Sequence, residues 1–130
     1  MDIKSLNNKQ KEAVVKVGGP MLVFAGAGSG KTRVLTYKIA YLIETIGLPP
    51  ENILAVTFTN KAAQEMKSRI HSLVSNELKG ITIGTFHSIG AMILRKEISR
   101  LGWNSNFTIY DQTDSKAVVK SVIKELDLDL

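Results

Sequence analysis

The sequence has 130 residues, of which 44% are hydrophobic and 22% charged, with ten glycines and three prolines. This composition excludes a disordered or collagen-like chain and favours a single soluble domain. The absence of cysteine excludes a disulfide scaffold, a thiolate zinc site and a cysteine nucleophile, and without a signal peptide or membrane span we expect a cytoplasmic protein. Residues 1–110 carry a net charge of +7 and residues 111–130 of −2, so a basic body suggests a polyanionic partner, a nucleotide or a nucleic acid.

Helices and strands are predicted to alternate along the chain. A short helix is predicted over residues 7–17, with Asn7 as its N-cap and Gln10 as the capping-box partner. The continuous apolar run Met21–Ala25 predicts a strand buried on both faces. Apolar residues at helical spacing then predict a helix that begins at Lys31 and ends before Gly47.

The same alternation continues in the second half of the chain. Strands are predicted over Ile53–Phe58 and Ile81–Thr85, each followed by an amphipathic helix, and a last amphipathic segment covers residues 119–126. This order predicts an α/β fold, a parallel sheet with helices on both faces. Three strands are fewer than such sheets usually contain, so the sheet is expected to be incomplete.

The segment Ala25–Thr32 has the sequence Ala-Gly-Ala-Gly-Ser-Gly-Lys-Thr. It matches the phosphate-loop pattern G-x-x-x-x-G-K-[ST] except at its first position, where Ala25 replaces glycine. Glycines allow backbone N–H groups to turn toward an anion, and the following helix adds the positive end of its dipole. Lys31 is therefore predicted to contact the β- and γ-phosphates, and the Thr32 hydroxyl to bind Mg²⁺. The alternative is a flexible turn followed by a surface lysine.

Two polar and aromatic clusters follow the second and third predicted strands, Thr57–Ala63 and Thr85–Ser88. Because ligands collect at the carboxyl ends of parallel strands, both clusters are expected at the edge that carries the phosphate loop. Their rings suit base stacking and their short polar groups suit phosphate contacts. Alternatively, the two phenylalanines are core residues, Thr59 or Asn60 caps a helix, and His87 is a surface residue.

Together these motifs resemble those of superfamily 1 DNA helicases of the UvrD, PcrA and Rep type. Residues 6–14 resemble the adenine-sensing Q motif, and the phosphate loop has the form usual in that family. Residues 55–63 resemble motif Ia and residues 84–90 motif Ib. The resemblance implies an incomplete RecA-like P-loop NTPase domain over residues 1–106, with the start of an inserted helical subdomain over residues 107–130.

The resemblance also implies ATP and Mg²⁺ as cofactors, with single-stranded DNA and a second RecA-like domain as partners. In that family Gln10 would read the adenine edge and Arg33 would pack against the base. The implied nucleotide-binding residues, with Lys31 as the catalytic residue and Thr32 as the Mg²⁺ ligand, are Gln10, Ala25, Gly26, Ala27, Gly28, Ser29, Gly30, Lys31, Thr32 and Arg33. The residues implied to line a track for single-stranded DNA are Phe58, Thr59, Asn60, Thr85, Phe86 and His87.

Hydrolysis in the family requires an acidic pair, a glutamine sensor and arginines from the second motor domain, and we recognise none of these in the 130 residues. Asp111 is the nearest candidate acid, although it also suits the start of the last helix. We therefore expect an N-terminal fragment of an ATP-dependent, 3′ to 5′ DNA helicase or translocase, inactive as a motor on its own. The alternatives are a compact P-loop nucleotide kinase or other phosphotransferase that uses Asp111, and a catalytically dead nucleic-acid-binding module.

Overall fold

The computed structural model describes residues 3–75 and 78–128. Its contacts divide the chain into two compact units, one up to Gly90 and one from Ala91 on. Short 3₁₀ helices lie at Ile3–Ser5, Pro50–Asn52 and Ile98–Leu101. The other elements are, in chain order, α1 (Asn8–Val15), α2 (Lys31–Glu44), β1 (Leu54–Thr57), α3 (Asn60–Leu73), β2 (Thr82–Thr85), α4 (Phe86–Glu97) and α5 (Gln112–Glu125).

The predicted helices are confirmed, and their starts follow from their caps. Asn7 caps α1 in a reciprocal capping box with Gln10, as predicted. Thr59, rather than Asn60, is the N-cap of α3, because its hydroxyl accepts a hydrogen bond from the N–H of Ala62. Asp111 caps α5 through bonds to the N–H groups of Thr113 and Asp114. Side chains that satisfy otherwise unpaired N–H groups thus fix these three helix starts.

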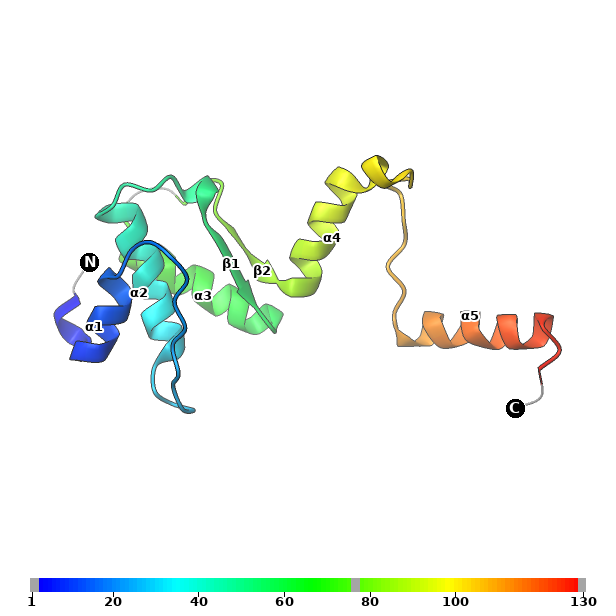
Figure 1. The fold of residues 1–130 in the computed structure, drawn as a ribbon, viewed down its shortest axis with the longest axis horizontal. Helices are drawn as coiled ribbons and strands as arrows, with labels where there is room; N and C mark the ends of the chain where they lie inside the picture. The colour runs from blue at the N-terminus through cyan, green and yellow to red at the C-terminus, as the bar shows by residue number, and fades with distance from the viewer. Residues whose placement is uncertain (1–2, 76–77, 129–130) are drawn as a thin grey trace. The chain divides into compact units, whose positions relative to one another are not determined.

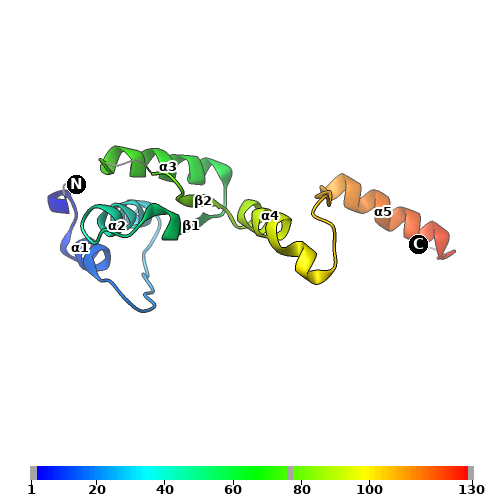
Figure 2. The same ribbon diagram turned by 90° about the horizontal axis from the view of Figure 1, so that it is seen from above.

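The sheet contains β1 and β2, paired in parallel with Leu54 opposite Thr82 and Thr57 opposite Thr85. α3 forms the connection between the two strands and contacts both of them, as Figures 1 and 2 show. Parallel pairing joined by a helical crossover is the α/β arrangement that the sequence predicts. Both strands therefore deliver the residues that follow them, Phe58 and Phe86, to the same edge.

The hydrophobic core of the first unit lies where α2, α3 and the sheet meet. Ile70 on α3 and Ala40 on α2 are completely buried. The period of three to four residues between core positions on each helix is that of an amphipathic helix facing a sheet. The buried core residues are Ile39, Ala40, Ile43, Ile53, Ala55, Met66, Ile70, Val74 and Leu78.

The predicted strand Met21–Ala25 is wrong in this structure. The segment is irregular, with Leu22 77% and Phe24 89% exposed. A strand with two apolar faces needs a partner along its backbone and a layer on each face. Among the described residues β1 and β2 pair only with each other, so the apolar run has no ladder to join. Met21 and Val23 are less exposed than their neighbours, which is the two-residue alternation of an extended chain.

The second unit contains the end of α4, the 3₁₀ turn Ile98–Leu101 and α5. Arg95 lies over the ring of Phe107, with its guanidinium carbon 4.8 Å from the ring centroid. No residue of α5 is buried, although apolar side chains recur along it at helical spacing. Across the described residues, no helix is both long and apolar enough to cross a membrane.

Candidate functional site

The glycine loop leads directly into the first turn of α2. Gly28 and Gly30 have φ values of +73° and +85°, which a residue with a side chain adopts only at a cost. Gly30 is the N-cap of α2 and offers no side chain to the first N–H groups of the helix. These N–H groups, with the positive end of the helix dipole, suit an anion. The predicted phosphate loop therefore ends in a backbone geometry that suits an anion.

Lys31 folds back over this loop. Its Nζ donates hydrogen bonds to the carbonyl oxygens of Ala25, at 2.9 Å, and of Gly26, at 2.7 Å. The hydroxyl of Ser29 also donates to the Gly26 carbonyl, at 2.6 Å, which closes the turn. The side-chain ammonium is therefore bonded to the loop, although the residue itself is exposed.

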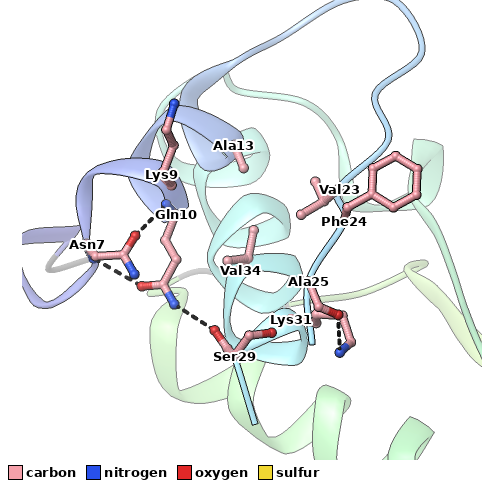
Figure 3. Close-up of a pocket in the computed structure, with 10 residues that line it drawn as sticks. All are labelled: Asn7, Lys9, Gln10, Ala13, Val23, Phe24, Ala25, Ser29, Lys31 and Val34. Atoms are coloured by element: carbon pink, nitrogen blue, oxygen red, sulfur yellow. Dashed lines mark hydrogen bonds between the residues drawn. The ribbon is translucent and has the colours of Figure 1, made fainter. Parts of the chain in front are cut away.

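Gln10 connects α1 to the loop, as Figure 3 shows. Its Oε1 accepts from the backbone N–H of Asn7 at 3.0 Å, and its Nε2 donates to the Ser29 carbonyl at 3.2 Å. The acceptor and donor partners together fix the orientation of the side-chain amide. One hydrogen and one lone pair of that amide remain for a ligand, the pair that an adenine edge requires. The capping-box and ligand-reading interpretations of Gln10 are therefore compatible.

The loop borders two hollows. One of about 240 Å³ lies between α1 and the loop, and Gln10, Phe24 and Lys31 are among the residues that line it. The other, of about 270 Å³, is lined by Lys31, Thr32 and Arg33 together with Glu65 and Arg69 of α3. Lys31 contributes to both hollows.

Lys38 fastens α1 to α2. Its Nζ donates to the carbonyl of Ala13 at 3.3 Å and, in a shorter contact, to that of Lys16. These carbonyls lie at the end of α1, where a cation is favourable for the helix dipole. Burial nevertheless lowers the pKa of Lys38 from its ordinary value of 10.5, because desolvation disfavours the charged form. Lys38 thus fixes the helix that carries Gln10 on the helix that carries Lys31.

The second candidate site is the edge at which β1 and β2 end. Phe58 and Phe86 follow the paired residues Thr57 and Thr85, and their ring centroids lie 5.4 Å apart at an interplanar angle of 46°. Phe58 is 89% exposed and Phe86 58% exposed. The two rings are therefore not core residues in the described chain, whereas the alternative interpretation of Thr59 as a helix cap is confirmed. An exposed aromatic pair of this kind offers π-faces to a stacking ligand.

Polar groups surround the aromatic pair. Thr59, Asn60 and His87 are exposed at the first turns of α3 and α4. Thr85 differs from the expectation of a surface position: it is only 7% exposed, and its hydroxyl contacts Ser88. It is the last residue of β2, and the pleat turns its side chain inward.

Comparison with known proteins identifies the family. Residues 6–130 match the UvrD/REP helicase N-terminal domain. The chain belongs to the UvrD/REP helicase family. It is 53% identical over 127 residues to the ATP-dependent DNA helicase PcrA of Staphylococcus epidermidis and 50% identical over 127 residues to that of Staphylococcus aureus. Each comparison covers 98% of this chain and 17% of the relative, so the chain spans about a sixth of the length of the curated relatives it matches.

Within this UvrD/REP helicase domain, the structure brings some predicted site residues together and separates others. Gln10 and Lys31 line one hollow, whereas Thr32 and Arg33 line the other. Arg33 also lies over the ring of Tyr37, with its guanidinium carbon 5.6 Å from the centroid. The two predicted base contacts, Gln10 and Arg33, thus face different hollows, and their roles stay predictions.

Two features bear on the alternatives to a helicase fragment. The carboxylate of Asp111 caps α5, which confirms the interpretation of this residue as a helix start. Among the described residues, no cluster of three or more acidic or histidine side chains is placed to hold a metal ion. The hydrogen bonds of Asp111 account for its place at the start of α5, and the phosphotransferase that would use it as a metal ligand stays a prediction.

Sequence reasoning missed two residues that support the sites. Ser88 received no role, because serine does not match the Glu or Gln that marks the third helical position of a capping box in a sequence. Lys38 left no sequence signal, since its acceptors lie 22 and 25 residues earlier in the chain. The role of Ser88 required the geometry at the start of α4, and that of Lys38 required the packing of α1 against α2.

Proposed function

We propose that this chain binds ATP with Mg²⁺ at the Ala25–Thr32 loop and contacts single-stranded DNA at the edge formed by Phe58 and Phe86. It would act as the N-terminal part of an ATP-dependent DNA helicase or translocase that moves 3′ to 5′, with a second RecA-like domain as its partner. The observation that carries the proposal is the placement of Lys31 over a glycine loop at a helix start that has no side-chain cap. The similarity to ATP-dependent DNA helicases PcrA supports the same proposal.

At the nucleotide site, each group present suits a part of ATP–Mg²⁺. The N–H groups at the start of α2 and the Lys31 ammonium suit the phosphates. Thr32 supplies a single hydroxyl oxygen, which fits Mg²⁺ because this ion usually retains waters and takes further oxygens from phosphate. When bound, the ion would neutralise phosphate charge. Gln10 would orient the base, and Lys31 would stabilise charge on the phosphates in the intact enzyme.

At the DNA site, the two rings would stack with bases while the first turns of α3 and α4 face the backbone phosphates. Thr59, Asn60 and His87 are exposed around the rings and offer polar groups for sugar and phosphate contacts. Stacking on an aromatic ring tolerates any base. We therefore expect binding without strong sequence preference.

The nucleotide proposal is tested by titrating the chain with fluorescent ATP in the presence of Mg²⁺. Lys31→Ala should weaken binding about tenfold or more, because charge-assisted bonds to phosphate are lost. Lys67→Ala, at an exposed position of α3, is the matched control and should bind as the unchanged chain does. Equal affinity of the Lys31 variant and the control would overturn the assignment.

The DNA proposal is tested with labelled oligothymidylate at several salt concentrations. Affinity should fall as salt rises, since phosphate contacts release counterions. A Phe58→Ala, Phe86→Ala double variant should lose about tenfold or more in affinity. Tyr110→Ala, which removes an exposed ring outside the proposed track, should not. Retained binding in the double variant would contradict the track.

A further inference from the structure

A closed set of hydrogen bonds links the end of β2 to the start of α4. The backbone N–H of Thr85 donates to Ser88 Oγ at 2.9 Å, and the backbone N–H of Ser88 donates to Thr85 Oγ1 at 3.2 Å. The two hydroxyl oxygens are 3.1 Å apart, and Ser88 Oγ donates to the Thr85 carbonyl at 3.0 Å. This reciprocal pattern is that of a capping box, with Thr85 before the first residue of α4 and Ser88 at its third position.

Gly84 provides the space for this set of bonds. A Cβ at Gly84 would lie 2.7 Å from Ser88 Oγ and 3.2 Å from Ile89 Cγ1. The φ angle of Gly84 lies outside the left-handed region, so its backbone is one that other residues adopt readily. Glycine is thus required here by close approach, and what approaches is the hydroxyl of Ser88.

The bonds lie on either side of Phe86 and His87, whose side chains are exposed, as is that of Ser88. Thr85 and Ser88 hold the backbone on either side of them, and Phe86 packs its ring against Phe58 at 5.4 Å. A side chain whose backbone is held at both ends keeps its place with little loss of conformational freedom on binding. Without the bonds between Thr85 and Ser88, the exposed ring of Phe86 would be less firmly held beside the ring of Phe58.

We propose that Ser88 is a positioning residue for the single-strand contact: it holds Phe86 beside Phe58 so that the two rings form a stacking platform before DNA arrives. This inference rests on the proposed DNA contact at the Phe58–Phe86 edge. In this proposal Ser88 affects DNA binding by fixing the position of the Phe86 ring.

The test is a double-mutant cycle on oligothymidylate affinity, measured by fluorescence anisotropy. Ser88→Ala should weaken binding about fivefold, the size of a lost helix cap expressed as an equilibrium constant. The same change in a Phe86→Ala background should have no further effect, because the ring it positions is absent. Ser88→Thr, which keeps a hydroxyl, should retain the affinity of the unchanged chain.

Two controls separate positioning from a general loss of structure. Ser72→Ala removes a comparable hydroxyl bond, to the Arg69 carbonyl at 2.8 Å, from α3 and should leave DNA affinity unchanged. The affinity of Ser88→Ala for fluorescent ATP should also be unchanged, since the glycine loop takes no part in these bonds. Gly84→Ala should reproduce the loss seen with Ser88→Ala, because its Cβ would displace the hydroxyl.

Each outcome supports or overturns the role of Ser88. A fivefold loss that depends on Phe86 supports it. Wild-type affinity in Ser88→Ala overturns it while leaving the DNA contact intact, and an equal loss with or without Phe86 overturns it in favour of a general structural effect. If the unchanged chain does not bind oligothymidylate at all, the proposed contact and the role of Ser88 fail together.

Discussion

Gly28 and Gly30 share a left-handed backbone but have different surroundings. A Cβ at Gly30 would lie 2.9 Å from Gln10 Nε2, whereas a Cβ at Gly28 would meet no atom within 4 Å. At the residue scale, Gly28 is therefore required only for its left-handed backbone. Gly30 is required for its left-handed backbone and also for the space that the Gln10 side chain occupies. The bond from Gln10 to Ser29 depends on that room.

This difference predicts unequal costs for two alanine substitutions in the nucleotide-free chain. Gly28→Ala should lower the free energy of unfolding by about 1–2 kcal/mol, the cost of a left-handed alanine. Gly30→Ala should cost about 1 kcal/mol more, because the Gln10 hydrogen bond is also displaced. Urea denaturation of the two variants measures the difference, and equal losses would contradict the proposed contact.

Lys38 makes folding stability depend on pH in a defined direction. Its pKa in the folded chain is lowered from 10.5 by desolvation, so the folded state binds fewer protons than the unfolded state between the two values. Stability contributed at this position therefore rises with pH through that window and levels off above 10.5. A neutral amine retains two N–H donors for the carbonyls of Ala13 and Lys16, so its hydrogen bonds survive deprotonation.

We expect this contribution to disappear in Lys38→Met. Thermal unfolding of the unchanged chain and of this variant is compared between neutral pH and pH of about 10.5. The stability of the unchanged chain should increase relative to that of the variant as pH rises. Lys67→Met, at an exposed site, corrects for the titration shared by all surface lysines. A constant difference across the range would exclude the effect of burial on Lys38.

At the scale of elements, the stability of α5 depends mainly on its N-cap. The helix has no buried residue, so packing contributes little to its stability within the described chain. Its start instead depends on the carboxylate of Asp111, which accepts from two N–H groups at 2.7 and 2.8 Å. Asp114 completes the box by accepting from the N–H of Asp111 at 3.1 Å. Short helices with little packing are marginal, and the cap then decides whether the first turn forms.

Two variants of Asp111 test this cap and the phosphotransferase alternative together. Asp111→Ala should reduce helical circular dichroism and destabilise α5 by about 1 kcal/mol, whereas Asp111→Asn should preserve it, because both Asp and Asn are good caps. Neither variant should alter ATP affinity. If Asp111→Asn abolished ATP consumption while the helix stayed intact, that result would support a catalytic metal ligand at this position.

At the scale of the whole molecule, the sequence predicts what is local and misses what depends on partners. The helices were predictable because amphipathic spacing and caps such as Asn7 and Asp111 lie within a few residues of one another. The strand at Met21–Ala25 was not, since strand formation requires a hydrogen-bonding neighbour that its own residues do not specify. The placement of Phe58 and Phe86 at one edge was predicted from the carboxyl-edge rule, whereas their exposure was left open against a core position. The inward turn of Thr85 was missed, because strand pleat follows from an exact register.

The hydrogen bonds of Lys31 have a thermodynamic consequence for the whole binding process. In the nucleotide-free chain the ammonium already interacts with two carbonyl oxygens of its own loop. A phosphate that recruits Lys31 must replace those acceptors, so binding is an exchange of partners and not a simple addition of contacts. The measured heat of binding then reports a difference between two sets of bonds. At the proposed phosphate site, part of the intrinsic affinity of lysine for phosphate would therefore be offset by the loss of these two bonds.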